Sequence, residues 1–260
     1  MKRFRATSLT SAILAVTAAT GADAASFRGD YTVSYLGLTV ARSTMTSTID
    51  GKAYAIDGSV STAGLGKIFD DTKATLSVSG RLSSGRAVPV RAHTDYKHDK
   101  KSKQLTITFA KGNVVDTVVV PPPKPRSADW IAVTNDQLRS VVDPLSALLV
   151  SSERMDEVCD RTVKFFDGEM RFDLKLRRDD VVDVDMPGYK GQAVTCSARF
   201  VPVSGYRAKK KSVKFMRDKG RISITFAPLG STGVYAPIRA SVGTEIGTLK
   251  LHARKVEAIE

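Results

Sequence analysis

The stretch VKFFDGEMRFDLKL, from Val163 to Leu176, contains two runs of alternating apolar and polar residues on either side of Asp167-Gly168. An Asp-Gly pair adopts the positive φ angles that tight hairpin turns require. When apolar and polar residues alternate at every second position of a strand, one face of the strand points toward a core and the other toward solvent. The stretch therefore predicts a β-hairpin with Asp167 and Gly168 at its tip.

The same pattern recurs along most of the chain, as in QLTITFAKG (104–112), RISITFAP (221–228) and TLKLHARKV (248–256). Glycine-containing turns separate these runs. We therefore expect a mainly β protein, with one antiparallel meander over about 27–120 and a second over about 160–258. Because sequential strands pair and long sheets must curl, we favour one strongly curved antiparallel sheet, barrel-like or spiral, over two subdomains.

A proline-rich connector, PPPKPR at 121–126, separates the two meanders and is followed by a helical insert expected over 127–157. Thr134 and Gln137 have the spacing of a capping box at a helix start. Asp143-Pro144 predicts a second short helix, with Asp143 as its N-cap and proline in the first helical position. We expect the insert to lie inside the curved sheet or across one end. The apolar face of its second helix consists of Leu145, Leu148 and Leu149.

The first 24 residues have the layout of a secretory signal peptide. Three cationic residues precede an apolar run that is too short to span a membrane and contains no cysteine for a lipoprotein anchor. Small residues place the expected cleavage between Ala24 and Ala25. We therefore predict a signal peptide over 1–24, a single β-rich domain over 25–260 and a periplasmic location. The alternative is a cytoplasmic protein with a chance apolar start.

The charge of the chain predicts anionic neighbours. The formal net charge is +13, and removing three cationic residues and one aspartate with the leader leaves +11. A field of this sign attracts anions in general. In a cell envelope these are lipid headgroups, lipopolysaccharide phosphates, peptidoglycan carboxylates and acidic proteins. Nucleic acid is disfavoured by that location and by the low aromatic content of 7%.

The chain has two cysteines, Cys159 and Cys196. In an exported protein, an isolated pair most simply forms a structural disulfide. Here it would tie the end of the helical insert to the strand GQAVTCSARFVPV. The alternative is a redox or metal role, for which the close C-x-x-C spacing is missing.

A burst of lysines follows the second cysteine: Lys209, Lys210, Lys211 and Lys214. We expect this burst to begin a hairpin edge, because lysine on an edge strand prevents pairing between sheets of different molecules. The alternative function is a surface that binds an anionic lipid or glycan.

Two clusters of acidic or histidine residues are candidate sites. His93, Asp95, His98 and Asp99 offer metal-ligand types, but nearby lysines oppose a cation, and a solvated turn is favoured. Asp183 and Asp185 share one strand face, where a carboxylate pair would suit glycoside hydrolysis or calcium, but a polar outer face is favoured. Neither a nucleophile elbow nor a complete phosphate-binding loop is present in the sequence. We therefore expect no cofactor, no metal and no enzymatic activity.

Several segments together resemble a known family. They are DYTVSYLGLTVARSTM, STAGLGKIFDD, VVDPLSALL, VKFFDGEMRFDL, YKGQAVTCSARFVPVSGYR and APLGSTGVYAPIRASVGTEIGTLKL. In this order they resemble the domain-of-unknown-function family numbered thirty-one-oh-eight, secreted or periplasmic proteins of Gram-negative bacteria. A looser similarity is to the β-spiral envelope-integrity proteins of alphaproteobacteria. That likeness implies a curled sheet with a disulfide and a role in envelope stability, but no catalytic residues.

Three functions follow as hypotheses. The favoured one is a non-enzymatic periplasmic envelope-maintenance protein that binds a lipid, a glycan or another protein and does not span the membrane. The second is a periplasmic carrier or sensor of acyl chains or lipoproteins, with the three leucines of the insert covering an apolar interior. The third is a cell-wall hydrolase that uses Asp183 and Asp185.

Overall fold

The structure is a computed structural model that describes residues 24–64, 66–69 and 71–259. The signal peptide expected over 1–24 therefore lies outside the described residues, apart from Ala24. The first strand begins at Ala25, the residue expected to open the mature chain. No helix among the described residues has both the length and the apolar character needed to cross a membrane.

One antiparallel sheet of 14 strands dominates the fold. Thirteen strands follow one another in the order β10-β11-β12-β14-β15-β16-β1-β2-β3-β4-β5-β6-β7, and β9 pairs with β15 off this path. The strands of the N-terminal half are β1 (Ala25–Tyr35), β2 (Leu38–Asp50), β3 (Ala53–Thr62), β4 (Thr72–Ser83), β5 (Arg86–His98), β6 (Lys101–Ala110) and β7 (Asn113–Val120). Those of the C-terminal half are β9 (Val150–Ser151), β10 (Thr162–Phe166), β11 (Arg171–Met186), β12 (Tyr189–Ser204), β14 (Ile222–Pro228), β15 (Val234–Thr244) and β16 (Gly247–Ile259).

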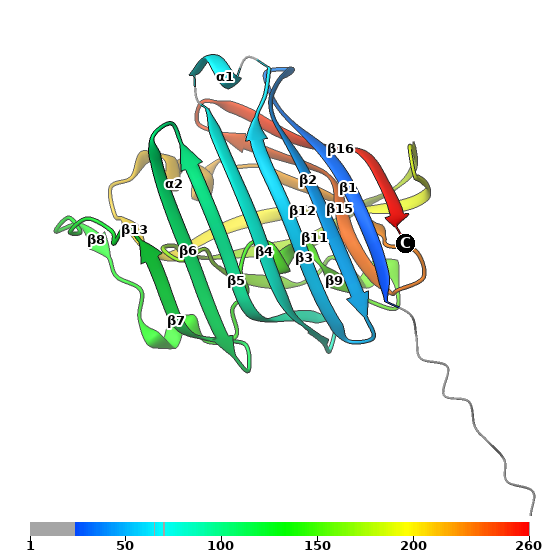
Figure 1. The fold of residues 1–260 in the computed structure, drawn as a ribbon, viewed down its shortest axis with the longest axis horizontal. Coiled ribbons are helices and arrows are strands. Elements are labelled where there is room, and N and C mark those ends of the chain that lie inside the picture. The colour runs from blue at the N-terminus through cyan, green and yellow to red at the C-terminus, as the bar shows by residue number, and fades with distance from the viewer. Residues whose placement is uncertain (1–23, 65, 70, 260) are drawn as a thin grey trace, which may run out of the picture.

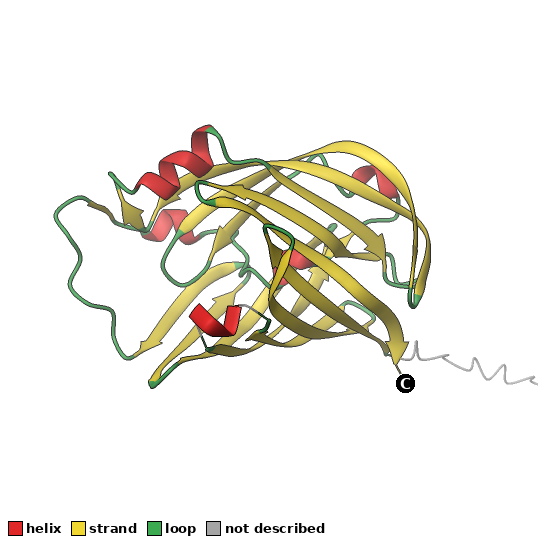
Figure 2. Ribbon diagram, turned by 90° about the horizontal axis from the view of Figure 1, so that it is seen from above, coloured by secondary structure: helices red, strands yellow, loops and turns green. Residues whose placement is uncertain are grey.

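The two expected meanders are parts of this single sheet. They join where β16 pairs with β1, with His252 opposite Thr32. Figures 1 and 2 show the sheet curling into two facing layers that are continuous through these two strands. The prediction of one strongly curved antiparallel sheet is therefore confirmed. Strand pairing does not close it into a complete barrel, because β7 and β10 stand at its two ends.

Alternating side chains fill the space between the layers. Ile56 of β3 and Ile107 of β6 are each 1% exposed, and Ile238 of β15 faces them from the other layer at 2%. The hairpin predicted from Val163 to Leu176 is confirmed, because β10 and β11 pair antiparallel around a turn at Asp167 and Gly168. Burying this apolar set stabilises the fold by roughly 25 cal/mol for each Å² removed from water.

The insert after the proline-rich connector differs from its prediction. It contains no α-helix but three short 3₁₀ helices, η1 (Asn135–Leu138), η2 (Ser146–Leu148) and η3 (Met155–Glu157), and the short strands β8 (Trp130–Ile131) and β9. The expected helices stay short because the chain enters the core directly after them, at Leu149, and then pairs with β15. Of the two positions expected for the insert, η2 takes the one inside the curved sheet, since it contacts β4, β5 and β15.

A buried polar network holds η2 in place. Asp143 is 2% exposed and accepts hydrogen bonds from the backbone N–H groups of Leu145 (2.9 Å) and Ser146 (3.0 Å). The Ser146 hydroxyl donates to the other carboxylate oxygen and lies 2.7 Å from the hydroxyl of Tyr54 in β3. The expected N-cap is thus corrected: the helix starts after Leu145, yet Asp143 still binds the free N–H groups at its start.

The insert also bridges the two ends of the sheet. Val142 forms an isolated parallel bridge with Phe165 of β10, and its N–H donates to the Lys164 carbonyl at 2.9 Å. The neighbouring Val141 N–H donates to the Gly112 carbonyl in the turn between β6 and β7 at 3.1 Å. A short piece of the insert therefore spans the gap that strand pairing leaves open.

The predicted disulfide between Cys159 and Cys196 is confirmed. Their Cα atoms lie 5.7 Å apart, and both residues are at most 1% exposed. Cys159 follows η3 and Cys196 lies in the middle of β12, within a second hydrophobic cluster that includes Val158 and Phe226. The bond thus joins the end of the insert to the sheet, as expected.

Candidate functional site

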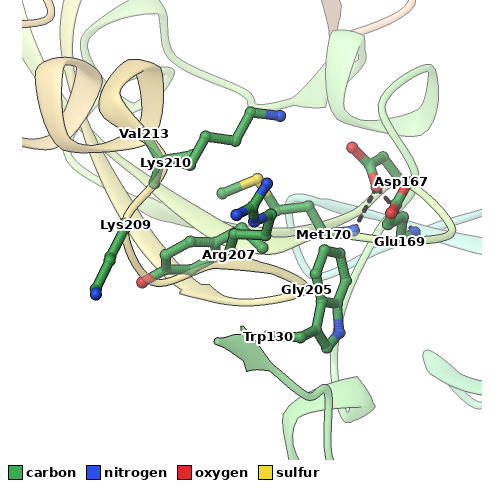
Figure 3. A pocket seen from close by; sticks show the side chains of 10 residues that line it. Trp130, Asp167, Glu169, Met170, Gly205, Arg207, Lys209, Lys210 and Val213 are labelled. Atoms are coloured by element: carbon green, nitrogen blue, oxygen red, sulfur yellow. Dashed lines mark hydrogen bonds between the residues drawn. The ribbon is translucent and has the colours of Figure 1, made fainter. Parts of the chain in front are cut away.

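A pocket of about 490 Å³ opens beside the two-stranded sheet of β8 and β13 (Tyr206–Arg207). Its other walls are the turn between β10 and β11 and the start of helix α2 (Lys211–Asp218). Figure 3 shows these segments converging on the pocket. The residues that line it are Trp130, Asp167, Glu169, Met170, Gly205, Tyr206, Arg207, Lys209, Lys210 and Val213.

Backbone contacts fix the shape of the pocket. Gly205 has φ +80°, and a Cβ atom there would lie 1.9 Å from the Glu169 carbonyl oxygen, so this close approach requires glycine. The Gly205 N–H donates to the Ile131 carbonyl at 2.7 Å, and the Ala208 N–H donates to the Asp129 carbonyl at 2.8 Å. The chain after β12 is therefore held between the insert and the β10–β11 turn.

Of the four lysines predicted as a candidate anionic-partner surface, Lys209 and Lys210 line this pocket, and none of the four lies on an edge strand. Lys209 and Lys210 occupy the turn before α2, whereas Lys211 and Lys214 belong to the helix itself. The expectation of a hairpin edge is wrong, because the chain turns into a helix instead of a new strand. Val213 of that helix faces the pocket. The guard against edge pairing therefore no longer explains these lysines.

Two carboxylates of the pocket are already engaged. Glu169 forms an ion pair with Arg126, which lies in the proline-rich connector. Asp167 accepts hydrogen bonds from the N–H groups of Glu169 (3.0 Å) and Met170 (2.6 Å), and so holds the turn between β10 and β11. Both side chains thus have partners within the chain.

A third carboxylate, Asp129, lies just outside the pocket and pairs with Arg207 at 3.2 Å. The Ser127 hydroxyl, which donates to Asp129, lowers the pKa of this carboxyl, and Arg207 lowers it further. Among the residues that the structure describes, Lys209 and Lys210 form no ion pair, and both are exposed. The free charge of the pocket is therefore positive.

The pocket also has a flat apolar wall. Trp130, Tyr206, Met170 and Val213 contribute it, and all four are partly buried. The Arg126 guanidinium stacks 4.1 Å from the centroid of the Trp130 ring, which fixes the indole by a cation–π contact. Figure 3 shows Lys210 extending over the pocket and Lys209 pointing outward at its rim. The arrangement suits a ligand with an anionic group beside a flat, weakly polar body.

The histidine cluster is a set of hydrogen bonds along the β5–β6 hairpin. The His93 ring nitrogens lie 2.8 Å from the Thr106 hydroxyl and 3.0 Å from Asp95, whose other oxygen accepts from Gln104 at 2.7 Å. His98 instead lies 3.6 Å from Asp99 at the end of the strand. Within residues 24–64, 66–69 and 71–259, no three metal-ligand side chains gather.

Asp183 and Asp185 both lie exposed on one face of β11, on either side of buried Val184. Asp185 forms an ion pair with Lys190 at 2.8 Å. Neither aspartate lines the pocket around Trp130. The expected polar outer face is therefore what the structure has.

The three leucines of the insert fill the interior of the sheet. Leu145 and Leu149 are 7% and 4% exposed within the main core, and Leu148 packs against it. The cavity beside Leu148 and Leu149 holds only about 50 Å³. An acyl chain of many carbons does not fit such a space.

A family model described as "Protein of unknown function (DUF3108)" matches residues 30–254. The chain belongs to DUF3108. The resemblance expected from the sequence is thereby confirmed over nearly the whole of the β-sheet. The match also covers both cysteines and the lysines at the pocket of this DUF3108 protein. No curated protein matches the chain.

Two solved structures are similar to the DUF3108 chain. One is a β-barrel-like protein of domain of unknown function DUF1849 from Brucella abortus, with TM-score 0.49, 10% identity and coverage of 91% of this chain and 98% of that one. Another is a "putative lipoprotein" from Parabacteroides distasonis, with TM-score 0.31, 9% identity and coverage of 89% and 94%. Similarity at this level carries no information about function.

Sequence reasoning found the lysines of the pocket but missed its aromatic wall and Arg126. Trp130 is the only tryptophan of the chain and follows the proline-rich connector by a few residues. A lone tryptophan next to a stiff connector was the available signal. Trp130 pairs with the segment after β12, which lies far from it in the sequence. No local sequence pattern predicts such a contact.

Proposed function

We propose that the protein is an exported, non-enzymatic envelope-maintenance protein that binds an anionic partner at the pocket around Trp130. The observation that carries the proposal is the charge arrangement. Glu169, Asp167 and Asp129 each bind a partner within the chain through one carboxylate oxygen, while Lys209 and Lys210 form no ion pair among the described residues and stand beside an aromatic wall. The buried disulfide supports export, because such bonds persist in oxidising compartments.

The partner best suited to the pocket is an anionic saccharide. A volume of about 490 Å³ is in the range of small-molecule sites and accommodates one or two sugar units. The flat wall of Trp130 and Tyr206 would pack against the apolar face of a sugar ring. A phosphate or carboxylate on that sugar would then reach the ammonium group of Lys210, which extends over the pocket, with Lys209 at the rim and Arg207 nearby.

The two other functions receive less support. An acyl-chain carrier needs an apolar cavity, and the two cavities beside the leucines of the insert hold only about 50 Å³ and about 80 Å³ because side chains of the insert occupy the interior. A hydrolase needs carboxylates aimed at a substrate, and Asp183 and Asp185 face outward, with Asp185 paired to Lys190. We therefore favour binding over catalysis.

Trp130 provides a direct test, because fluorescence of the only tryptophan reports on this pocket alone. N-acetylglucosamine 1-phosphate and unphosphorylated N-acetylglucosamine form a matched pair of probes. We expect the phosphorylated sugar to change the emission saturably and to bind at least about tenfold more tightly.

The variant Lys209→Gln/Lys210→Gln should remove that preference for phosphate. The control Lys100→Gln/Lys101→Gln removes the same charge from the β5–β6 turn and should behave as wild type. Equal affinity for both sugars, or equal loss in both double variants, would contradict the proposal.

A further inference from the structure

A second cationic pocket, of about 460 Å³, lies beside the disulfide on another side of the molecule. It is bounded by the turn between β4 and β5, by η2 with the chain after it, and by the segment from Cys159 into β10. None of its residues lines the pocket around Trp130. Its lining includes Arg86, Arg161 and Lys164, the carboxylates of Glu157 and Asp160, and the apolar Leu149 and Val150.

Arg161 is fixed at this pocket without a carboxylate partner. Its Nη1 donates to the Gly85 carbonyl at 2.8 Å, and its Nη2 donates to the Glu157 carbonyl at 2.6 Å. Both acceptors are neutral, and within the described part of the chain the buried Nε–H finds no acceptor. A half-buried guanidinium with only neutral partners is costly, because its charge has lost water without gaining a counter-charge.

A second arginine makes this arrangement more costly. Arg86 follows Gly85 directly and lines the same pocket. Burial, and next the charge of Arg86, lower the pKa of Arg161, which means that the two like charges repel each other. The carboxylate of Glu157 attracts Arg161 in return, but it is shared with Arg154, whose Nε lies 3.7 Å away.

The other carboxylate at this pocket is also engaged. Asp160 accepts a hydrogen bond from the backbone N–H of Arg178 at 3.3 Å and is exposed. Lys164 adds a further positive charge to the lining. The pocket therefore holds three cationic side chains, and neither of its two carboxylates forms an ion pair with Arg86, Arg161 or Lys164 among the described residues.

We infer that this pocket binds an oxyanion, a phosphate or carboxylate group, between Arg86 and Arg161. Such a group would relieve the repulsion between the two arginines. It would also accept hydrogen bonds from the N–H groups of Arg161 that do not bind the carbonyls of Gly85 and Glu157. Leu149 and Val150 form an apolar wall next to this charged end. The oxyanion is thus either a free ion or the charged end of a ligand with an apolar chain.

The site has a structural consequence for the disulfide. Arg161 lies two residues after Cys159, and its two hydrogen bonds join the β4–β5 turn to the end of the insert. A ligand bound here would hold the same segments together. Binding should therefore raise the midpoint of thermal unfolding, and the rise should grow with the logarithm of the ligand concentration above the dissociation constant.

Calorimetric titration with inorganic phosphate and with octyl phosphate, in a buffer free of other oxyanions, tests the inference. The wild type should bind at least one of them at a single site, and Arg86→Gln, which changes an exposed side chain, should weaken binding about tenfold or more. Arg161→Gln should abolish saturable binding. Tighter binding of octyl phosphate would identify a ligand with an apolar chain, and equal binding would identify a free ion.

The matched control is Arg91→Gln, which removes one exposed charge from β5 and lines neither this pocket nor the one around Trp130. It should bind phosphate as the wild type does. Failure of the wild type to bind either probe saturably at millimolar concentration would overturn the inference, and so would equal weakening by Arg91→Gln. Because Trp130 lies in the other pocket, its emission should stay unchanged here, so the two proposals fail separately.

Discussion

The curved sheet and the insert are stabilised in different ways. In the sheet, each strand is paired along its length with a neighbour, and almost all of these neighbours are adjacent in sequence. The insert between β7 and β10 depends instead on a few separate attachments: the disulfide, the Asp143 network and the bridge at Val142. Loss of one attachment should therefore loosen the insert locally, whereas the sheet unfolds as a unit. The insert also brings distant segments together to form both pockets.

The largest effect should come from the sheet core. Ile107→Ala removes a side chain that is 1% exposed between the two layers and should lower the free energy of unfolding by about 4 kcal/mol. Urea denaturation should show one transition shifted to lower concentration, because the sheet unfolds as a unit. The control Thr108→Ala changes the neighbouring residue, which points to the other face. An equal loss in both variants would contradict the assigned inner face of β6.

Removal of the disulfide should rank second. Cys159→Ser/Cys196→Ser opens a link across 37 residues and should cost about 3 kcal/mol. Hydrogen exchange should accelerate mainly between η1 and β10, while β1 to β6 keep their protection. Uniform acceleration through the whole sheet would show that the insert is not a separately attached region.

The Asp143 network should have a smaller, pH-dependent effect. Asp143→Ala removes the acceptor for three hydrogen bonds and should cost about 2 kcal/mol, more than the single bond lost in Tyr54→Phe. Burial raises the pKa of the Asp143 carboxyl above its unfolded value. The folded state then holds the proton more tightly, so this contribution to stability is full below the unfolded pKa and falls as pH rises through the folded pKa.

Asp143→Asn removes that titration with little change of shape. Relative to this variant, the wild type should be more stable at pH 4 than at pH 7, measured as the difference in thermal midpoint. A difference that does not change between the two values would mean that Asp143 has the same pKa in both states.

The smallest effect on stability should come from the lysines at the Trp130 pocket. Lys209→Gln/Lys210→Gln alters two exposed side chains and should change the free energy of unfolding by less than about 0.5 kcal/mol. A larger loss in urea denaturation would show that these lysines stabilise the fold, which would weaken their assignment to ligand binding.

The difference between the sheet and the insert also explains which features can be predicted from the sequence. The hairpin at Asp167-Gly168 and the strand faces of Ile107 and Ile224 follow from local alternation and turn residues. The disulfide follows from there being only two cysteines. The 3₁₀ helices of the insert and the helix at Lys211 do not follow, because packing between layers and a turn after β12 override the local pattern. The Trp130 pocket combines both kinds of feature. Its lysines are visible in the local sequence, whereas the pairing of Trp130 with the segment after β12 is not.

Binding of an anionic saccharide at the Trp130 pocket is tested most directly by a crystal structure of the protein grown with N-acetylglucosamine 1-phosphate. The account predicts a sugar ring against Trp130, with its phosphate within hydrogen-bond distance of the Nζ atoms of Lys209 or Lys210. An empty pocket in crystals grown at saturating ligand, or a sugar whose phosphate points away from both lysines, would contradict it.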